Sequence, residues 1–251
     1  AKLDILWLRP ENDFLPDLEE LERMLRPNTK LVVLNNPNNP TGALLMGANL
    51  EEFVAVVRTS GAYILCDEVY RGTNQVGNGF APGMADIYEK GISVSSMSKV
   101  FSLAGIRLGW IVAPREVLEA VSIRRDYNTI SVGMIDDYFA SLALENKEKI
   151  IGRSQKITRG NLKILDDWVS KEHSISYKKP QAGTTALLKY DFDIPSREFC
   201  IQLLRETGVM FTPGSVMEME GWLRIGYANS PEVLSQGLDL VSNFLSQMGS
   251  K

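Results

Sequence analysis

A set of polar side chains stands where short apolar runs of the sequence end. The set comprises Asn39 in NNPTG, Asp67 and Tyr70 in DEVY, Ser96, Ser98 and Lys99 in SSMSK, and Arg107 in GIRLGW. An amide, a carboxylate, a phenol, hydroxyls, an amine and a guanidinium would together suit a phosphorylated aromatic aldehyde. We therefore ask what chemistry each group can do toward such a ligand.

Each group has a distinct use in this interpretation. The amine of Lys99 can form a Schiff base with the aldehyde. The carboxylate of Asp67 can pair with a ring nitrogen and keep it protonated, which strengthens the ring as an electron sink. Tyr70 and Asn39 can hydrogen-bond a ring hydroxyl. The serines and Arg107 can bind the phosphate, with the guanidinium binding in a bidentate manner.

Five of these residues also have a plainer interpretation. Lys99 alone would be read as a solvated loop lysine, and Asp67 as a helix cap after a strand. Asn39 can be a turn former between prolines, Tyr70 a core residue and Arg107 part of a surface ion pair. These interpretations weaken together, because several independent coincidences would have to share one spacing pattern.

The elements that must position these residues follow from hydrophobic periodicity. Short apolar runs predict strands over residues 30–36, 62–67, 91–96 and 108–113, each buried on both faces. Helical spacing predicts helices over residues 14–25, 48–61 and 114–126. The pattern favours an α/β fold with a largely parallel sheet. Functional residues gather past the carboxyl ends of such strands, and Asn39, Asp67 and Lys99 follow this rule.

The second part of the chain has a different organisation. Residues 135–170 are strongly helical, and a mixture of short strands and helices follows, which predicts a smaller α+β unit. We expect a cofactor-binding domain over residues 1–150 and a smaller domain over residues 151–251. The chain opens with Ala in a strand-like stretch, LDILWL, and is expected to be a piece of a longer protein.

Composition excludes several classes of function. The net charge is −4 and no basic block occurs, which argues against nucleic-acid binding. No apolar run reaches the ~18 residues of a membrane span. Two cysteines without a CxxC motif, Cys66 and Cys200, argue against a disulfide framework and favour a reducing, cytoplasmic location. A single histidine, His173, makes a metal site or a Ser-His-Asp triad improbable.

The motifs also resemble a known family. NPNNPTG, DEVY and SMSKVFSLAGIRLGW, in this order and spacing, resemble the fold-type I pyridoxal phosphate enzymes, and among them the class I/II aminotransferases. The resemblance covers essentially the whole chain, including GVMFTPGS and WLRIGYA near its end. It implies a three-layer, largely parallel sheet of the large domain, incomplete here, with a smaller C-terminal α+β domain.

The resemblance also implies an activity and a cofactor. A homodimeric transferase of amino-acid metabolism would move an amino group between an amino acid and a 2-oxo acid, using pyridoxal 5′-phosphate. The catalytic residues would be Lys99, Asp67 and Tyr70. The cofactor would be held by Asn39, Asp67, Tyr70, Ser96, Ser98, Lys99 and Arg107. The substrate would be bound by Arg224, through its α-carboxylate, and by Asn39.

The chain departs from the family pattern at its start. Family members normally carry a substantial segment, the N-terminal third, before the stretch that corresponds to LDILWL. That segment supplies a phosphate-gripping loop and an aromatic ring that stacks on the cofactor. Without it, we expect the large-domain sheet to lack a strand and to expose apolar surface.

Two alternative functions remain open. The motifs bind cofactor and carboxylate but do not choose which Cα bond breaks, so a C–S lyase, a decarboxylase or an amino-acid oxidase would share them. The stretch RDYNTISVGMIDD is an uncommon version of its region among aminotransferases. The chain would also suit the effector domain of an aminotransferase-like transcriptional regulator, which would carry a DNA-binding module upstream.

Overall fold

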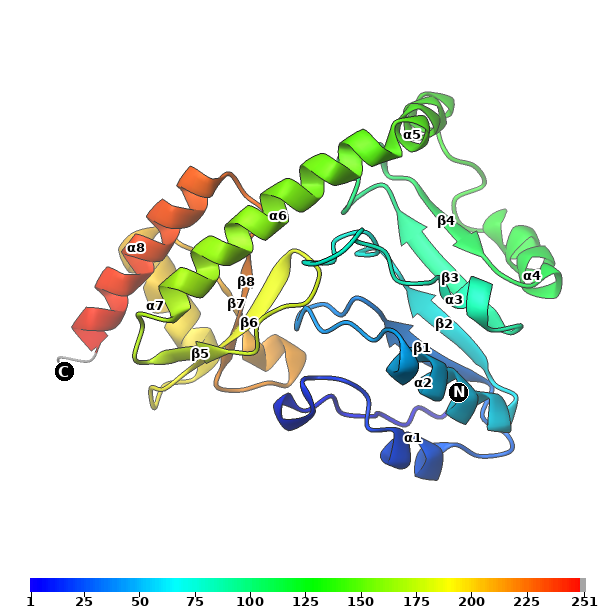
Figure 1. Cartoon of the computed structure of the whole chain (residues 1–251), viewed down its shortest axis with the longest axis horizontal. Coiled ribbons are helices and arrows are strands. Elements are labelled where there is room, and N and C mark those ends of the chain that lie inside the picture. The colour runs from blue at the N-terminus through cyan, green and yellow to red at the C-terminus, as the bar shows by residue number, and fades with distance from the viewer. Residues whose placement is uncertain (249–251) are drawn as a thin grey trace.

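The structure, a computed structural model, describes residues 1–248 and divides into two units around two sheets (Figure 1). We call residues 1–146 the N-terminal unit and residues 147–248 the C-terminal unit. The long helix α6 (Lys147–Val169) starts beside the first sheet and runs across to the second. Both sheets have four strands among the described residues.

The N-terminal unit contains the largely parallel sheet that the sequence predicts. Its strands β1 (Leu31–Asn35), β2 (Tyr63–Asp67) and β3 (Gly91–Ser96) are parallel neighbours in that order. Strand β4 (Gly109–Val112) pairs antiparallel with β3. The helices of this unit are α1 (Leu18–Met24), α2 (Ala48–Ser60), α3 (Met84–Ile87), α4 (Arg115–Arg125) and α5 (Met134–Glu145), with 3₁₀ turns at Pro10–Asn12 and Ala104–Ile106.

Helix α2 connects β1 to β2 and packs on one face of the sheet. Its buried residues, Leu50, Phe53, Val54 and Val57, recur at helical spacing and join a core cluster with Ile64 and Cys66 of β2. The helix ends at a glycine in the left-handed conformation, which satisfies a terminal carbonyl. The predicted helix over residues 48–61 is therefore confirmed.

The C-terminal unit is an antiparallel sheet covered by helices. Strands β5 (Ile175–Tyr177), β6 (Thr185–Tyr190), β8 (Trp222–Gly226) and β7 (Thr212–Pro213) are neighbours in that order. Helices α6, α7 (Ser196–Thr207) and α8 (Pro231–Met248) enclose its core, and a 3₁₀ turn spans Gly214–Met217. The continuous helix expected over residues 135–170 is two helices, because Asn146 leaves the helical conformation between α5 and α6.

Strand β1 differs from its predicted burial. Leu31 is 46% exposed and Val33 67% exposed, because helix α2 covers the opposite face of β1, where Val32 and Leu34 pack against its core cluster. The strand-like stretch at residues 3–8 also forms no strand, since it has no hydrogen-bonded neighbour among residues 1–248 and a strand depends on its pairing.

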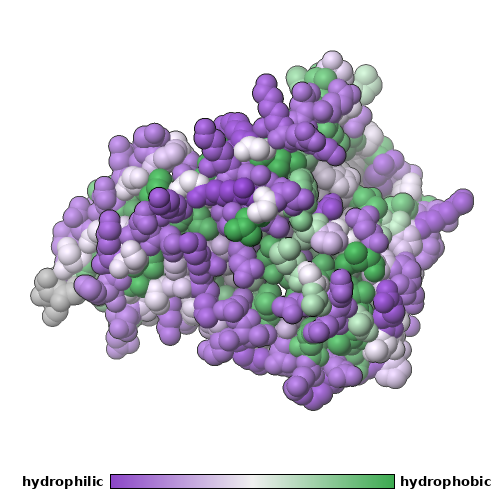
Figure 2. All heavy atoms as spheres, in the orientation of Figure 1, coloured by the Kyte–Doolittle hydropathy of each residue, from purple (hydrophilic) through white to green (hydrophobic). Residues whose placement is uncertain are grey.

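Apolar side chains are exposed at several places on the N-terminal unit, as the sequence predicts. Ile111 and Val112 are exposed on β4, the opposite edge of the sheet. Figure 2 shows green apolar patches between the polar side chains over this unit, on the right of the view. None of the helices described in residues 1–248 is both long and apolar enough to cross a bilayer.

Several contacts join the two units. The carbonyl of Gly42, in the loop after β1, accepts hydrogen bonds from the backbone N–H groups of Gln181 and Ala182, at 2.8 and 3.1 Å. Phe14, which is 2% exposed, packs edge-on against Trp222, with ring centroids 5.7 Å apart. The loop after β1 is therefore fixed to the loop before β6.

Substitution of Gly42 tests whether this close approach holds the two units together. Gly42 has a φ of +71°, and an added Cβ would lie 2.4 Å from Cβ of Pro180. Gly47 has a similar φ of +58° with nothing within 4 Å of an added Cβ. We expect Gly47→Ala to cost about 1–2 kcal/mol of unfolding free energy for its left-handed backbone, and Gly42→Ala about 1–3 kcal/mol more for overpacking.

Urea unfolding of both variants measures this difference. Equal losses for the two variants would show that the close approach of Gly42 to Pro180 does not hold the units together.

Candidate active site

The carboxyl ends of the three parallel strands lie at one edge of the first sheet. The last residue of β1, Asn35, is in register with Asp67, and Asp67 is in register with Val94 of β3. The last residue of β3, Ser96, pairs with Gly109 at the start of β4. The loops that carry Asn39, Tyr70, Lys99 and Arg107 therefore all leave or enter the sheet at this edge.

Asn35 braces two of these loops. Its Nδ2 donates to the carbonyl of Asp67 at 3.0 Å, and its Oδ1 accepts from the backbone N–H of Asn39 at 2.6 Å. The N–H of Asn36 donates to the same Asp67 carbonyl at 3.0 Å. The sequence analysis did not single out Asn35, although a run of asparagines beside prolines is a signal for side-chain bonds to the backbone.

Asp67 stands at the end of β2 with a half-buried side chain. One carboxylate oxygen, Oδ1, accepts from the backbone N–H of Val69 at 3.1 Å. This bond is the cap-like role considered for Asp67 from the sequence. It uses one of the two oxygens of the carboxylate.

Lys99 and Tyr70 are neighbours across this edge. The Nζ of Lys99 lies 5.9 Å from the centroid of the Tyr70 ring, within the range of a cation–π contact. Lys99 is exposed, whereas Tyr70 is only 3% exposed. The ring of Tyr70 is therefore a fixed element beside an amine that reaches solvent.

The residues expected to bind a phosphate lie in the loop after β3 and in the turn before β4. The Oγ of Ser96 accepts from the backbone N–H of Ser98 at 3.3 Å. Arg107 is exposed, has a φ of +50° and donates from its guanidinium to the carbonyl of Ala104 at 2.7 Å. The structure thus brings the serines together, and it places Arg107 at the same edge with its guanidinium bonded to its own loop.

Arg224 lies in the other unit. It is half-buried on β8, in register with Leu187 of β6, and its guanidinium donates to the hydroxyl of Thr212 at 3.2 Å. The neighbouring strand β6 begins at Thr185, whose hydroxyl reaches the carbonyl of Pro40 at 3.4 Å. The sheet that carries Arg224 is therefore bonded to the loop that carries Asn39.

The loop after Tyr70 is held from outside by helix α6. Gln155 donates from Nε2 to the carbonyls of Gly72 and Asn78, both at 3.0 Å. The guanidinium of Arg159 donates to the carbonyls of Asn74 and Gly77 at 2.9 Å. The helix thus fixes the backbone of a glycine-rich loop next to the candidate site.

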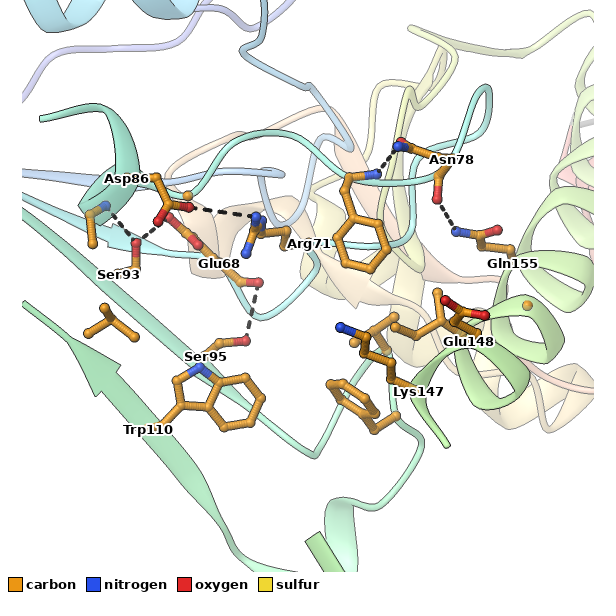
Figure 3. A pocket seen from close by; sticks show the side chains of 18 residues that line it. Glu68, Arg71, Asn78, Asp86, Ser93, Ser95, Trp110, Lys147, Glu148 and Gln155 are labelled. Carbon is orange, nitrogen blue, oxygen red and sulfur yellow. Dashed lines mark hydrogen bonds and ion pairs between the residues drawn. The ribbon is translucent and has the colours of Figure 1, made fainter. Parts of the chain in front are cut away.

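A cavity of about 710 Å³ lies on the other face of β3 (Figure 3). Ser93 and Ser95 line it, and strand alternation places their side chains opposite to those of Val94 and Ser96. Trp110 of β4 and Lys147 at the start of α6 face the same space. This cavity is therefore distinct from the strand edge that carries Lys99.

Glu68, the residue after Asp67, is a buried carboxyl group on the wall of this cavity. It is 4% exposed and accepts from the backbone N–H of Met84 at 2.6 Å and from the hydroxyl of Ser93 at 2.7 Å. Burial raises the pKa of Glu68 above its usual range, although the two hydrogen bonds and the charge of Arg71 act in the opposite direction.

Comparison with known proteins gives a consistent family. The sequence profile of the family described as "Aminotransferase class I and II" matches residues 2–239. Capreomycidine synthase of Streptomyces vinaceus is 30% identical over 95% of this chain and 61% of its own length. Aspartate aminotransferase of Thermotoga maritima is 30% identical over 93% of this chain and 61% of its own length.

Solved structures are also similar. A PLP-dependent aminotransferase from Streptococcus suis is 42% identical, with a TM-score of 0.95 over 99% of this chain and 66% of that one. The aspartate aminotransferase of Thermus thermophilus with maleate is 27% identical, with a TM-score of 0.85 over 94% of this chain. The chain spans 61% of the length of the two curated relatives above.

The raised pKa of Glu68 predicts a pH dependence of stability. A carboxyl whose pKa is higher in the folded state stabilises the fold while it is protonated. The contribution of Glu68 to the unfolding free energy should therefore fall as pH rises from about 4.3, the ordinary glutamate value, through the higher pKa of the folded state. In Glu68→Gln this decrease should be lost, because the amide keeps its acceptor oxygen and does not titrate.

Urea unfolding at a series of pH values compares the two proteins. If the profiles of wild type and Glu68→Gln are parallel throughout, Glu68 does not carry the raised pKa.

Proposed function

Because the chain belongs to the family of class I and II aminotransferases, we propose that the complete protein is a pyridoxal phosphate-dependent aminotransferase. It would move an amino group between an amino acid and a 2-oxo acid. The observation that carries this proposal is the position of Asn39, Asp67 and Lys99, at one edge of three neighbouring parallel strands.

The residues at this edge fit pyridoxal phosphate in their chemistry. A solvent-accessible amine, Lys99, stands beside the fixed ring of Tyr70. The carboxylate of Asp67 has one oxygen engaged with the backbone and is only half-buried. The hydroxyl of Ser96 stands at the end of β3 and that of Ser98 in the turn that follows, where backbone N–H groups also suit an anion.

Each residue would hold one part of the cofactor. Asp67 would pair with the protonated ring nitrogen, and Asn39 and Tyr70 would hydrogen-bond the ring oxygen. Ser96 and Ser98 would bind the phosphate. Arg107 would exchange its contact with the carbonyl of Ala104 for the phosphate, and a bidentate charge-assisted pair is the stronger of the two.

When bound, pyridoxal phosphate supplies an aldehyde that condenses with primary amines and a ring that stabilises negative charge at Cα. The protein's part is to place acids, bases and substrate around it. Lys99 would hold the cofactor and then, as a free amine, move a proton at the substrate Cα. A lysine amine must be neutral to do this.

Arg224 would bind the substrate α-carboxylate. A guanidinium on β8 matches a carboxylate in geometry, and its present partner is a neutral hydroxyl, that of Thr212. Asn39 lies in the loop that is bonded to the same sheet through Thr185 and Pro40. A substrate held by Arg224 would thus be oriented relative to the edge that carries Lys99.

One observation supports a second reaction at the same site. Capreomycidine synthase, as similar to this chain as the aspartate aminotransferase is, bears the name of a synthase. A C–S lyase, a decarboxylase or an oxidase would use the same cofactor and carboxylate contacts. The dependence of turnover on a 2-oxo acid acceptor distinguishes transamination from these reactions.

We also propose the larger organisation of the protein from the family resemblance. The domain boundary at residues 150–151 falls within α6, whose first turns pack on an apolar cluster of the N-terminal unit through Ile151. A cytoplasmic homodimer is supported by the absence of disulfides in residues 1–248 and by exposed apolar side chains on α4 and α5, including Ile123, Met134 and Ile135.

The role of Lys99 can be tested by covalent trapping. Full-length protein mixed with pyridoxal phosphate should give an absorbance band that borohydride makes permanent, and the label should map to the peptide that contains Lys99. Lys99→Ala should lose both band and label, because no other amine stands at the strand edge in residues 1–248. Lys163→Ala, an exposed lysine on α6, is the matched control.

A band that survives borohydride in Lys99→Ala would contradict the assignment of this lysine. If Lys99→Ala kept the band and the label mapped to another lysine, that lysine would be the one that binds the cofactor.

The role of Arg224 can be tested by kinetics. In Arg224→Gln the KM for amino acid and for 2-oxo acid should both rise by about 10–100-fold, since a charge-assisted bidentate pair is worth about 1.5–3 kcal/mol. The trapping reaction with pyridoxal phosphate should be unchanged. Arg197→Gln, on the exposed side of α7, serves as control. Unchanged KM values for both substrates would rule out the carboxylate role.

A further inference from the structure

Gly183, in the loop before β6, lies at the junction of the two units, and its N–H makes a hydrogen bond across it. Its N–H donates to the hydroxyl of Thr73 at 2.7 Å, and its carbonyl accepts from the hydroxyl of Tyr227 at 2.8 Å. Thr73 belongs to the loop after Tyr70, whereas Tyr227 directly follows β8. Gly183 is buried and has a φ of +87°.

On one side, this contact leads to the candidate site. The hydroxyl of Thr73 donates to the carbonyl of Tyr70 at 2.5 Å while it accepts from Gly183. Thr73 is 1% exposed, so this hydroxyl has no competition from solvent. It therefore connects the backbone of Tyr70, the ring beside Lys99, to the C-terminal unit.

On the other side, the contact leads to the strand of Arg224. The hydroxyl of Tyr227 donates to Gly183 and accepts from Nε2 of Gln75 at 3.3 Å. Tyr227 is fully buried, and burial raises the pKa of its phenol well above the usual range, so the hydroxyl keeps its proton. Tyr227 is the third residue after Arg224 along the chain.

Two further bonds hold the ends of this chain of contacts. The backbone N–H of Gln75 donates to the carbonyl of Gln181 at 2.9 Å. Asn161 of α6 donates from Nδ2 to the carbonyl of Tyr227 at 2.8 Å. The hydroxyls of Thr73 and Tyr227 thus each act as donor and acceptor inside a buried, closed network.

We infer that Thr73 and Tyr227 are positioning residues that act through Gly183. They set the distance from Arg224, which would bind the carboxylate, to Lys99 and Tyr70. The inference rests on the proposed function, because it concerns the spacing between the proposed carboxylate site and the proposed reactive amine. Neither residue touches the reacting groups. A substrate bound at Arg224 must also reach the cofactor held at Lys99, so a change in their spacing weakens substrate binding and raises KM.

The test uses the full-length protein with Thr73→Val, Tyr227→Phe and the double variant. We expect kcat/KM for the amino acid to fall about tenfold in each single variant, mainly through KM, because the loss of a buried bond loosens the spacing. Thr73→Ser retains the hydroxyl and should restore the wild-type value. The double variant should lose less than the product of the single losses, since both act through Gly183.

Matched controls separate positioning from stability. Tyr190→Phe removes a buried hydroxyl of β6 that bonds Ile194 within the C-terminal unit. Thr158→Val removes one that bonds Ser154 within α6. Both controls should lower the melting temperature and leave KM unchanged. Covalent trapping of pyridoxal phosphate by Lys99 should be equal in all variants.

A second measurement does not depend on activity. Spin labels at Glu51→Cys on α2 and Arg205→Cys on α7 report the distance between the units, and the native cysteines are buried. Tyr227→Phe and Thr73→Val should broaden this distance distribution, and Tyr190→Phe should not. If wild type neither traps the cofactor nor turns over, the proposed function fails, and this distribution alone decides whether the network positions the units.

Unchanged KM together with an unchanged distance distribution in Tyr227→Phe and Thr73→Val would overturn the inference. A KM increase of the same size in Tyr190→Phe would do so as well, because it would trace the effect to general destabilisation.

Discussion

The parallel register of β1, β2 and β3 is the constraint on which the candidate site depends. Parallel strands send their carboxyl ends to one edge, and here these ends are nearly level, with Asn35 opposite Asp67. Side chains that are distant in sequence therefore lie close together there, because the strands that precede them are neighbours in the sheet. The antiparallel return of β4 adds Arg107 to the same edge, because it begins where β3 ends.

Backbone groups, more than side-chain pairs, hold the site in shape. Asn35 bonds the loop of Asn39 to the carbonyl of Asp67, and α6 bonds carbonyls of the loop that follows Tyr70. Because the partners in these hydrogen bonds are backbone groups, the bonds do not occupy the polar ends of the functional side chains. This explains how Lys99 and Arg107 stay exposed in a loop region whose backbone is well bonded.

The junction of the two units combines hydrogen bonds with a few apolar contacts, such as Phe14 against Trp222, whereas each unit has its own apolar core. Hydrogen bonds are directional and lose their value with small displacements, while apolar contacts tolerate sliding. The hydrogen bonds at Gly42 and Gly183 therefore fix the distance between the two units more than they add to the free energy of unfolding. The proposed function requires this property, because one unit would hold the substrate carboxylate and the other the amine of Lys99.

The sequence by itself predicted much of the fold and the residue types that stand at the strand ends. Hydrophobic period and glycine and proline positions predicted β2, β3 and α2 closely, because these signals are local. The sequence likewise indicated that Lys99, Asp67 and Asn39 are candidate residues and that each stands after a strand. The burial of β1 and the strand at residues 3–8 were not predicted correctly, since both depend on which neighbours a strand has. Only the tertiary structure decided that Thr73 and Tyr227 meet at Gly183, because hydrogen bonds across 110 and 44 residues leave no periodic trace in the sequence.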